Sequence, residues 1–278
     1  MHNKLLSIII LVSIIIGAST LTRGHQWGDD FAWYILQAKS IVNGTTDEFM
    51  EISDFTNYQS TLHLGPLAYP WGYPLILAPV YALKEIHPLA LKLPGLFFYA
   101  GFLICLYLFA KDRFTRTESL LLVSLFAFNP LLLRFLDQIL SDIPFLFFSM
   151  LSFMLMTQED KRGVSHYALI GTSVFFMAFL RVTGALLLGC FLVVEFFKLL
   201  KNRKDRVAAM EIIRNSFAAC FVFALLWGLN LLLFPSGGVS YFSHYTELIE
   251  TARELAPTYF NIFSLFFGEA KVWIYLYY

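Results

Sequence analysis

Two adjacent carboxylates, Asp29 and Asp30, follow the first apolar run of the chain by only a few residues. Ionisable side chains this close to a membrane helix are energetically costly, so they are functional candidates by default. In a water-filled cleft, such a carboxylate can act as a general base for an acceptor hydroxyl or can hold a divalent cation. The alternative is that both are solvated loop residues, and the dipeptide alone does not decide.

Three further ionisable residues, Asp137, Asp142 and Arg181, interrupt long apolar stretches. An arginine can bind a phosphate through two parallel N–H bonds, while a carboxylate activates an attacking hydroxyl. These groups suit transfer of a sugar from a lipid-linked phosphate, with the arginine or a cation stabilising the leaving phosphate. Each has an alternative: Asp142 lies in Ser-Asp-Ile-Pro, which is also typical of a helix start, and Arg181 could extend to lipid headgroups.

The stretch 65–74 is dense in proline and aromatic residues, including Tyr69, Trp71 and Tyr73. These rings could bind substrate by stacking on a sugar or a prenyl chain, or they could form an aromatic belt at the membrane interface. His63 lies just before this segment. No histidine has metal-ligand spacing, and His63 is the best histidine candidate for a substrate contact.

The composition predicts an integral membrane protein, since 58% of the 278 residues are hydrophobic and only 14% are charged. The formal net charge is zero, which gives no indication of nucleic-acid binding. The three cysteines lie within apolar runs without disulfide or metal spacing. The expected fold class is therefore an all-α, polytopic helical bundle surrounded by membrane lipids.

About seven transmembrane helices are expected, together with surface helices. The apolar tract 164–200 is too long for one helix across a hydrocarbon core of about 30 Å, so we expect a break at Arg181. The run 75–83 is too short to cross and is expected to be half-embedded or on the surface. The remaining spans are expected at 5–21, 89–110, 119–133, 143–156 and 217–234.

The charged turns predict the orientation. Basic turns at 111–116, 159–163 and 198–206 are expected in the cytoplasm, and the acidic loop 22–70 is expected outside. The first run, although it could be a signal peptide, is taken as an uncleaved helix that starts in the cytoplasm. On this topology five residues from three loops meet at the outer face: Asp29, Asp30, Asp137, Asp142 and Arg181.

We expect one transmembrane domain over residues 1–278. Its first extracytoplasmic loop, 22–88, contains an amphipathic surface helix at 31–42 that ends in the turn Asn43-Gly44-Thr45. The segment 235–278 is expected to be extracytoplasmic, with a second surface helix at 240–256 and the start of a further helix. The final apolar run stops abruptly at Tyr278, which indicates a truncated product.

Four short motifs occur in order along the chain: Gly28-Asp29-Asp30-Phe31, Tyr69-Pro70-Trp71-Gly72-Tyr73-Pro74-Leu75, Leu140-Ser141-Asp142-Ile143-Pro144-Phe145 and Leu180-Arg181-Val182-Thr183-Gly184. With the first helix, this pattern resembles the C-type (GT-C) polytopic glycosyltransferases. It is most similar to the protein O-mannosyltransferase-like branch, which includes lipopolysaccharide-core and aminoarabinose transferases.

The resemblance implies a transferase that takes a hexose or pentose from a polyprenyl-phosphate donor to a lipid, glycan or protein acceptor. It implies a multi-pass protein of the bacterial inner membrane whose active site faces the periplasm. The family's base corresponds to Asp29 or Asp30, its second acidic position to Asp142 and its arginine to Arg181. We favour Asp29 slightly as the base, because Asp30 is closer to the helix start. A divalent cation, Mg²⁺ or Mn²⁺, is the candidate cofactor, with Asp30 and Asp142 as candidate ligands.

Two other interpretations remain: a transporter or flippase of lipid-linked glycans, and an inactive truncated remnant. A transporter is expected to show repeated halves, broken helices and ionisable groups at mid-membrane. Here the ionisable residues are predicted at one rim and no halves repeat, which favours the enzyme.

The orientation can be tested in a chain whose native cysteines are replaced by alanine. A cysteine introduced beside Asp54 should react with an impermeant thiol reagent on intact cells, because the acidic loop is translocated. A cysteine beside Arg203 should react only after permeabilisation, because basic turns stay in the cytoplasm. The reverse labelling pattern would place Asp29 and Arg181 in the cytoplasm and contradict the predicted convergence.

Overall fold

The chain divides into two compact units, residues 1–236 and 237–278. The computed structural model describes residues 2–25, 30–58, 67–158 and 163–235, all within the first unit. Every regular element in these ranges is helical, which confirms the all-α class. Several predicted features lie outside the described residues: Asp29, His63, most of the basic turn 159–163, the second surface helix at 240–256 and the start of the further helix after it.

The helices follow one another through short connections. In chain order they are α1 (His2–Thr20), α2 (Asp30–Asn43), α3 (Thr46–Tyr58), α4 (Gly72–Lys84), α5 (Pro88–Ala110), α6 (Arg116–Ala127), α7 (Pro130–Leu136), α8 (Asp142–Met156), α9 (Val164–Leu180), the 3-10 turn η1 (Val182–Ala185), α10 (Leu186–Lys201) and α11 (Arg206–Leu233). The expected surface helix at 31–42 is α2, and the short run at 75–83 belongs to α4.

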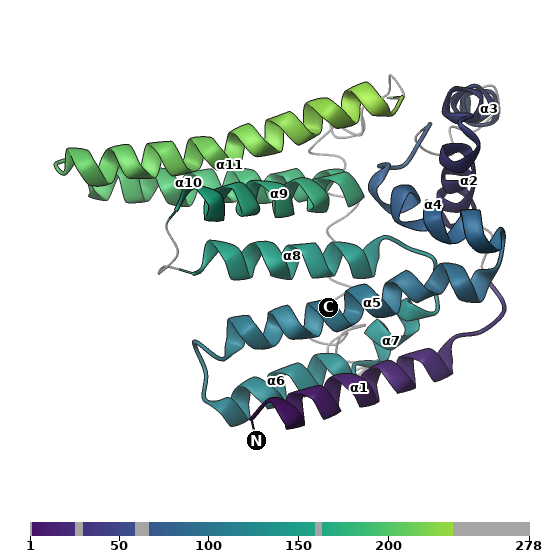
Figure 1. Cartoon of the computed structure of the whole chain (residues 1–278), viewed down its shortest axis with the longest axis horizontal. Helices are drawn as coiled ribbons and strands as arrows, with labels where there is room; N and C mark the ends of the chain where they lie inside the picture. Colours follow the sequence, from purple (N-terminus) through teal and green to yellow (C-terminus); the bar gives the residue numbers. More distant parts are fainter. Residues whose placement is uncertain (1, 26–29, 59–66, 159–162, 236–278) are drawn as a thin grey trace, which may run out of the picture. The chain divides into compact units, whose positions relative to one another are not determined.

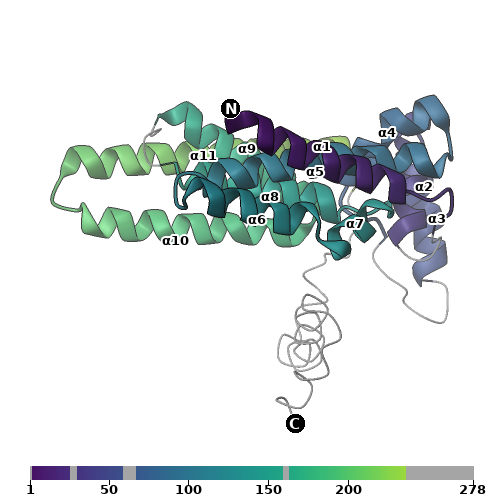
Figure 2. The same cartoon turned by 90° about the horizontal axis from the view of Figure 1, so that it is seen from below.

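The long helices of the first unit lie side by side and alternate in direction along the chain (Figure 1). The smaller helices α2, α3 and α4 gather at the end where α8 begins and α9 ends (Figure 1). At the opposite end, the hairpin of α10 and α11 extends beyond the other helices, as both views show (Figures 1 and 2). The turns 111–115 and 202–205, the end of α8 and the start of α9 therefore share one end of this unit, and the start of α8 and the end of α9 share the other.

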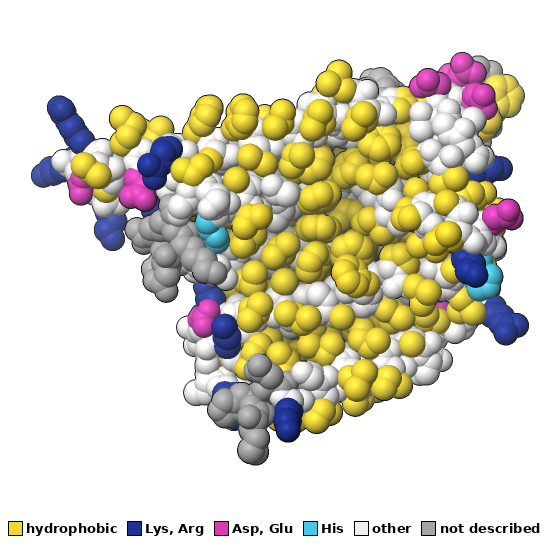
Figure 3. Space-filling model, in the orientation of Figure 1, with side chains coloured by type: hydrophobic (Ala, Val, Ile, Leu, Met, Phe, Trp, Pro, Cys, Tyr) yellow, Lys and Arg dark blue, Asp and Glu magenta, His cyan; other side chains and the backbone are white. Residues whose placement is uncertain are grey.

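Several helices are suited to a membrane. Among the described residues, three are long and apolar enough to cross one: Pro88–Ala110, Val182–Lys201 and Arg206–Leu233. The pair α6 and α7, bent by 51°, makes a fourth if it forms one span. Large apolar side chains point outward, with Phe97 75%, Leu125 71% and Leu232 83% exposed, and hydrophobic side chains cover the face seen in Figure 3. A surface of this kind favours lipid as the surroundings.

The predicted break at Arg181 is confirmed, because α9 ends at Leu180 and η1 begins at Val182. Arg181 itself is extended, with φ −147° and ψ 125°. The chain then folds back so tightly that a Cβ on Gly184 would lie 2.5 Å from the carbonyl carbon of Met177. A side chain at 184 would push the turn away from α9, so glycine is needed for this close approach.

Two other glycines bring helices into backbone contact. A Cβ on Gly171 would collide with the carbonyl oxygen of Ala219, so α9 and α11 touch main chain to main chain. A Cβ on Gly72 would lie 2.5 Å from the carbonyl oxygen of Phe179, which fixes the start of α4 against the last turn of α9. Between α2 and α3, Gly44 has φ +67°, as the predicted turn requires.

A buried cluster joins α2, α4, α5 and the end of α9 at the end of the first unit where α8 begins, which we call the rim. It contains Tyr34, Ile35 and Ala38 of α2, Tyr73 and Leu77 of α4, Leu91 of α5, Ile139, and Leu180 of α9. Tyr34, Ile35 and Ala38 recur at helical spacing, so α2 buries one face against α4 and the end of α9. The first loop is thereby held in place over the ends of α8 and α9.

Candidate functional site

Arg181 and Asp142 form an ion pair at the rim, although 39 positions separate them in the sequence. Nη2 of Arg181 donates to Oδ2 of Asp142 at 2.8 Å. The two side chains are 39% and 29% exposed, so the pair is open to a ligand. We name Arg181, Asp142, Ser141, Tyr34 and Asp30 the rim cluster.

Ser141 connects the pair to the first loop. It occupies the N-cap position of α8, yet its hydroxyl makes no capping bond. Instead Ser141 Oγ accepts from Nε of Arg181 at 3.1 Å and lies 3.2 Å from the hydroxyl of Tyr34. The helix-start interpretation explains why Asp142 is the first residue of α8. It does not explain why Ser141, a residue type suited to capping, bonds to Arg181 instead of capping the helix.

Asp30 and Tyr34 are the two residues that α2 contributes to the rim cluster. They are four residues apart on α2 and therefore lie on one face of that helix. Burial raises the pKa of Tyr34 to about 12, with the negative charges of Asp30 and Asp142 adding to the rise and Ser141 and Arg181 opposing it. The phenol thus stays protonated and can donate its hydrogen to Ser141 Oγ, while that oxygen also accepts from Arg181.

The two described carboxylates influence each other. Asp142 experiences the negative charge of Asp30 as well as the positive charge of Arg181. The rim cluster thus contains two carboxylates and one guanidinium. Such a site can accept a proton or accommodate an additional anion at Arg181.

The aromatic segment supports the rim cluster from behind. Tyr73 is 2% exposed and meets the Tyr34 ring edge-on at 5.0 Å, while Trp71 is 6% exposed and stacks on Phe234. These two rings are therefore buried within the protein and unavailable for stacking on a substrate in this conformation. Tyr69 is only partly buried, with its ring 5.1 Å from that of Tyr34.

The backbone of the aromatic segment is also fixed. The amide side chain of Gln37 donates to the carbonyl oxygen of Tyr69 at 2.9 Å and accepts from its N–H at 3.1 Å. The indole N–H of Trp71 donates to the carbonyl oxygen of Pro235 at 3.1 Å. Together with the close contact of Gly72 and Phe179, these bonds hold the last turn of α9, and hence Arg181, in position.

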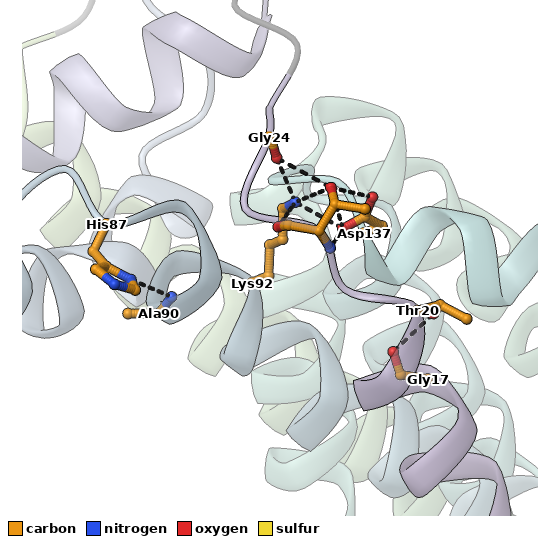
Figure 4. Close-up of polar contacts among 8 residues, drawn as sticks. Gly17, Thr20, Gly24, His87, Ala90, Lys92 and Asp137 are labelled. Carbon is orange, nitrogen blue, oxygen red and sulfur yellow. Dashed lines mark hydrogen bonds and ion pairs between the residues drawn. The ribbon is translucent and has the colours of Figure 1, made fainter.

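Asp137 belongs to a different group. Its Oδ1 accepts from Nζ of Lys92 at 2.7 Å and from the N–H of Thr22 at 2.6 Å. Lys92 has a fully buried side chain and also donates to the carbonyl oxygens of Thr22 and Gly24. Figure 4 shows the Lys92 amino group between Gly24 and Asp137. None of these partners belongs to the rim cluster, so the predicted convergence of Asp137 with Arg181 is not seen in these contacts.

The charges around Lys92 are balanced internally. Burial raises the pKa of Asp137, but the hydrogen bonds from Lys92 and Thr22 and the charge of Lys92 outweigh it, so the pKa is lowered. Burial and the charge of Lys92 lower the pKa of His25 to about 4, against the opposing effect of Asp137. This group ties the end of α1 to α5 and to the end of α7, which indicates a structural role.

Sequence reasoning missed Tyr34, Ser141 and Lys92. Lys92 carried a usable signal, since a lysine inside the run 89–110 is an ionisable residue in a predicted span. Tyr34 could have been found from its spacing of four residues from Asp30. Ser141 carried no distinguishing signal, because a serine before Asp142 fits a helix cap.

Among the described residues, no three His, Cys, Asp or Glu side chains are grouped as metal ligands. Mg²⁺ is usually bound by one or two carboxylates together with substrate phosphates and water. Binding of a cation by Asp30 and Asp142 therefore stays a prediction.

Comparison with known proteins does not identify a family: no family model matches the chain, and no curated protein is similar to it. The resemblance to GT-C glycosyltransferases therefore stays a prediction.

We expect Asp137→Asn to destabilise the fold by about 3 kcal/mol, because breaking one partner of a buried pair leaves Lys92 without its counter-charge. The measurement is thermal unfolding of the purified protein in detergent. Because the pKa of Asp137 is lowered in the fold, its contribution is present above the unfolded pKa of about 4 and lost as pH falls through the folded value. The difference in unfolding temperature between wild type and variant should therefore shrink as the pH falls.

Asp112→Asn, at an exposed aspartate, serves as the control and should leave the unfolding temperature unchanged. The double variant Lys92→Met, Asp137→Asn should recover much of the loss, since no buried charge remains. Equal stability of Asp137→Asn and wild type at neutral pH would contradict the structural role.

Proposed function

We propose that this chain is a polytopic membrane glycosyltransferase. It moves one sugar from a polyprenyl-phosphate donor to a lipid, glycan or protein acceptor at the extracytoplasmic face. The observation that carries the proposal is the rim cluster, in which three segments distant in sequence bring Asp30, Asp142 and Arg181 together. An open arginine flanked by carboxylates at the end of an apolar bundle suits a reaction between a lipid phosphate and a hydroxyl.

Arg181 is the proposed donor-binding residue. Its Nε bond to Ser141 orients the guanidinium, and the side chain is 39% exposed, so its planar fork can receive a phosphate. An incoming phosphate competes with Asp142 for Nη2. Because Asp142 already accepts a hydrogen bond from that nitrogen, the exchange replaces one anionic partner of Arg181 with another.

The proposed general base is Asp29 or Asp30, with Asp29 slightly favoured because Asp30 is closer to the helix start. The carboxylate takes the proton of the acceptor hydroxyl as its oxygen bonds to the anomeric carbon of the sugar. The bond from that carbon to the phosphate oxygen breaks, and polyprenyl phosphate leaves with the electron pair. Arg181 stabilises the charge that develops on this leaving phosphate.

A divalent cation is compatible with the same residues. Asp30 and Asp142 would hold it together with the donor phosphate and water, as Mg²⁺ sites commonly do. The cation would supply additional charge stabilisation at the leaving phosphate.

The proposed topology has seven passes: α1, α5, bent α6 and α7, α8, α9, α10 and α11. Of these, α8 has 15 residues and α9 has 17, which gives lengths of about 22 and 26 Å against a hydrocarbon core of about 30 Å. Their ends at the rim cluster therefore lie slightly below the headgroups, where a polyprenyl phosphate can reach Arg181 from the side. We place this end outside the cytoplasm, in a bacterial inner membrane.

The general base can be tested by replacing each aspartate with asparagine, which keeps the size and removes the charge. We expect Asp30→Asn or Asp29→Asn to lower the rate of transfer by about 10²–10⁴-fold, the usual contribution of a general base. The assay follows release of polyprenyl phosphate from a panel of polyprenyl-phosphate hexoses and pentoses.

Asp54→Asn, at an exposed aspartate of α3, is the matched control and should keep the wild-type rate. Full activity in both Asp29→Asn and Asp30→Asn would show that neither carboxylate is the base. Movement of a lipid-linked sugar across the membrane without release of polyprenyl phosphate would instead indicate a flippase.

The role of Arg181 can be tested by binding alone. Arg181→Lys keeps the charge but loses the planar fork, so we expect the affinity for a fluorescent polyprenyl phosphate to fall about tenfold. Arg134→Lys, at an exposed arginine of α7, should bind like wild type. If Arg181→Lys and Arg181→Ala both retain wild-type affinity while remaining folded, Arg181 is an interfacial anchor.

A further inference from the structure

A second candidate site lies at the opposite ends of α8 and α9 from the rim cluster. Here the last turn of α8, the first turns of α9 and the middle of α10 enclose a cavity of about 240 Å³, with Arg113 from the turn before α6 at its edge. Its ionisable lining residues are Arg113, His166, Glu195 and Lys198. None of these side chains has a role in the proposed transfer reaction.

Glu195 is the unusual member of this lining. The residue is only 3% exposed, although it is a carboxylate on an apolar helix. Its Oε1 accepts from Nζ of Lys198 at 2.6 Å, whereas Oε2 is buried without a hydrogen-bond partner among the described residues. An unsatisfied carboxylate oxygen away from water is costly, so a cation that pairs with this carboxylate from the cavity would stabilise it.

Two cations share the cavity with this carboxylate. Arg113 is held by its bond to the carbonyl oxygen of Phe109 at 2.7 Å and by its position 3.9 Å from the Phe109 ring centroid. The Lys198 side chain is 47% exposed, so part of its ammonium remains open to a second acceptor. The cavity therefore offers an acceptor for a cation and donors for an anion, which is the charge pattern complementary to a zwitterion.

The size and position of the cavity favour a lipid headgroup. Sites for drug-sized ligands are typically about 300–1,000 Å³, so this cavity is too small for a nucleotide or an oligosaccharide. It is lined with Leu155, Ile170 and Val194, and on α10 the side chains of Val193 and Phe197 are 54% and 63% exposed. Acyl chains could continue along that face, and basic pockets between membrane helices are common sites for headgroups.

We propose that this cavity binds an ethanolamine phosphate group, as carried by phosphatidylethanolamine. The primary ammonium pairs with the carboxylate of Glu195, and the phosphate accepts from Arg113 and Lys198. A choline headgroup has no N–H to donate, and a glycerol headgroup lacks the positive charge. The site should therefore discriminate among lipids that share the same phosphate.

The test measures lipid retention by native mass spectrometry of the purified chain, exchanged with phosphatidylethanolamine, phosphatidylcholine or phosphatidylglycerol of matched acyl chains. Wild type should retain phosphatidylethanolamine roughly tenfold more strongly than phosphatidylcholine, the size of effect expected for a hydrogen bond to a charged group. Glu195→Gln keeps the shape and removes the charge, so the preference should fall to near unity.

Glu211→Gln is the matched control, because Glu211 also pairs with a cation three residues later, Arg214, but is exposed on α11. This variant should keep the preference. Arg113→Gln should weaken retention of phosphatidylethanolamine and phosphatidylglycerol alike, since it removes a phosphate contact. Its lipid retention also gives an independent test of the site if Glu195→Gln does not fold.

Competition with soluble O-phosphoethanolamine tests whether the site binds the lipid or the free metabolite, which carry the same ethanolamine phosphate group. Competition by the soluble compound at millimolar concentration would support a site for the free metabolite as well, whereas retention of the lipid alone would show that the acyl chains contribute. Equal retention of phosphatidylethanolamine and phosphatidylcholine by wild type would overturn the proposal, as would an unchanged preference in Glu195→Gln.

Discussion

The close approach of backbones at the end of α9 determines the geometry of the rim. Gly72 lets the start of α4 contact the carbonyl of Phe179, and Gly184 lets η1 fold back onto Met177. Arg181 lies between these two contacts and is extended because α9 cannot continue through them. The direction of its side chain is therefore set by main-chain packing on both sides, and the polar bonds to Ser141 and Asp142 follow from that position.

This arrangement explains why the aromatic segment matters even though two of its rings are buried. Trp71 and Tyr73 flank Gly72 and pack against Phe234 and Tyr34. The buried surfaces of these two rings hold Gly72 against α9, because the glycine has no side chain that could pack there. A substitution in this segment would therefore act on Arg181 through the backbone, without touching a ligand.

The sequence predicted the elements well because hydrophobic periodicity and charged turns are local signals. The break at Arg181, the α2 helix and its Gly44 turn follow directly from those patterns. The site was predicted less completely, because the partner of each charged residue depends on packing between distant segments. Asp142 and Arg181 do meet, whereas Asp137 pairs with Lys92, a residue whose surroundings no local pattern reveals.

The unequal helix lengths have a mechanical consequence. With 28 residues, α11 measures about 42 Å, which exceeds a hydrocarbon core of about 30 Å, whereas α8 and α9 fall short of it. Because Gly171 holds α9 against the backbone of α11, the two helices cannot slide independently to match the lipid. In the proposed topology, bilayer thickness therefore determines how deep Arg181 lies below the headgroups, and lipids of different chain length should change that depth.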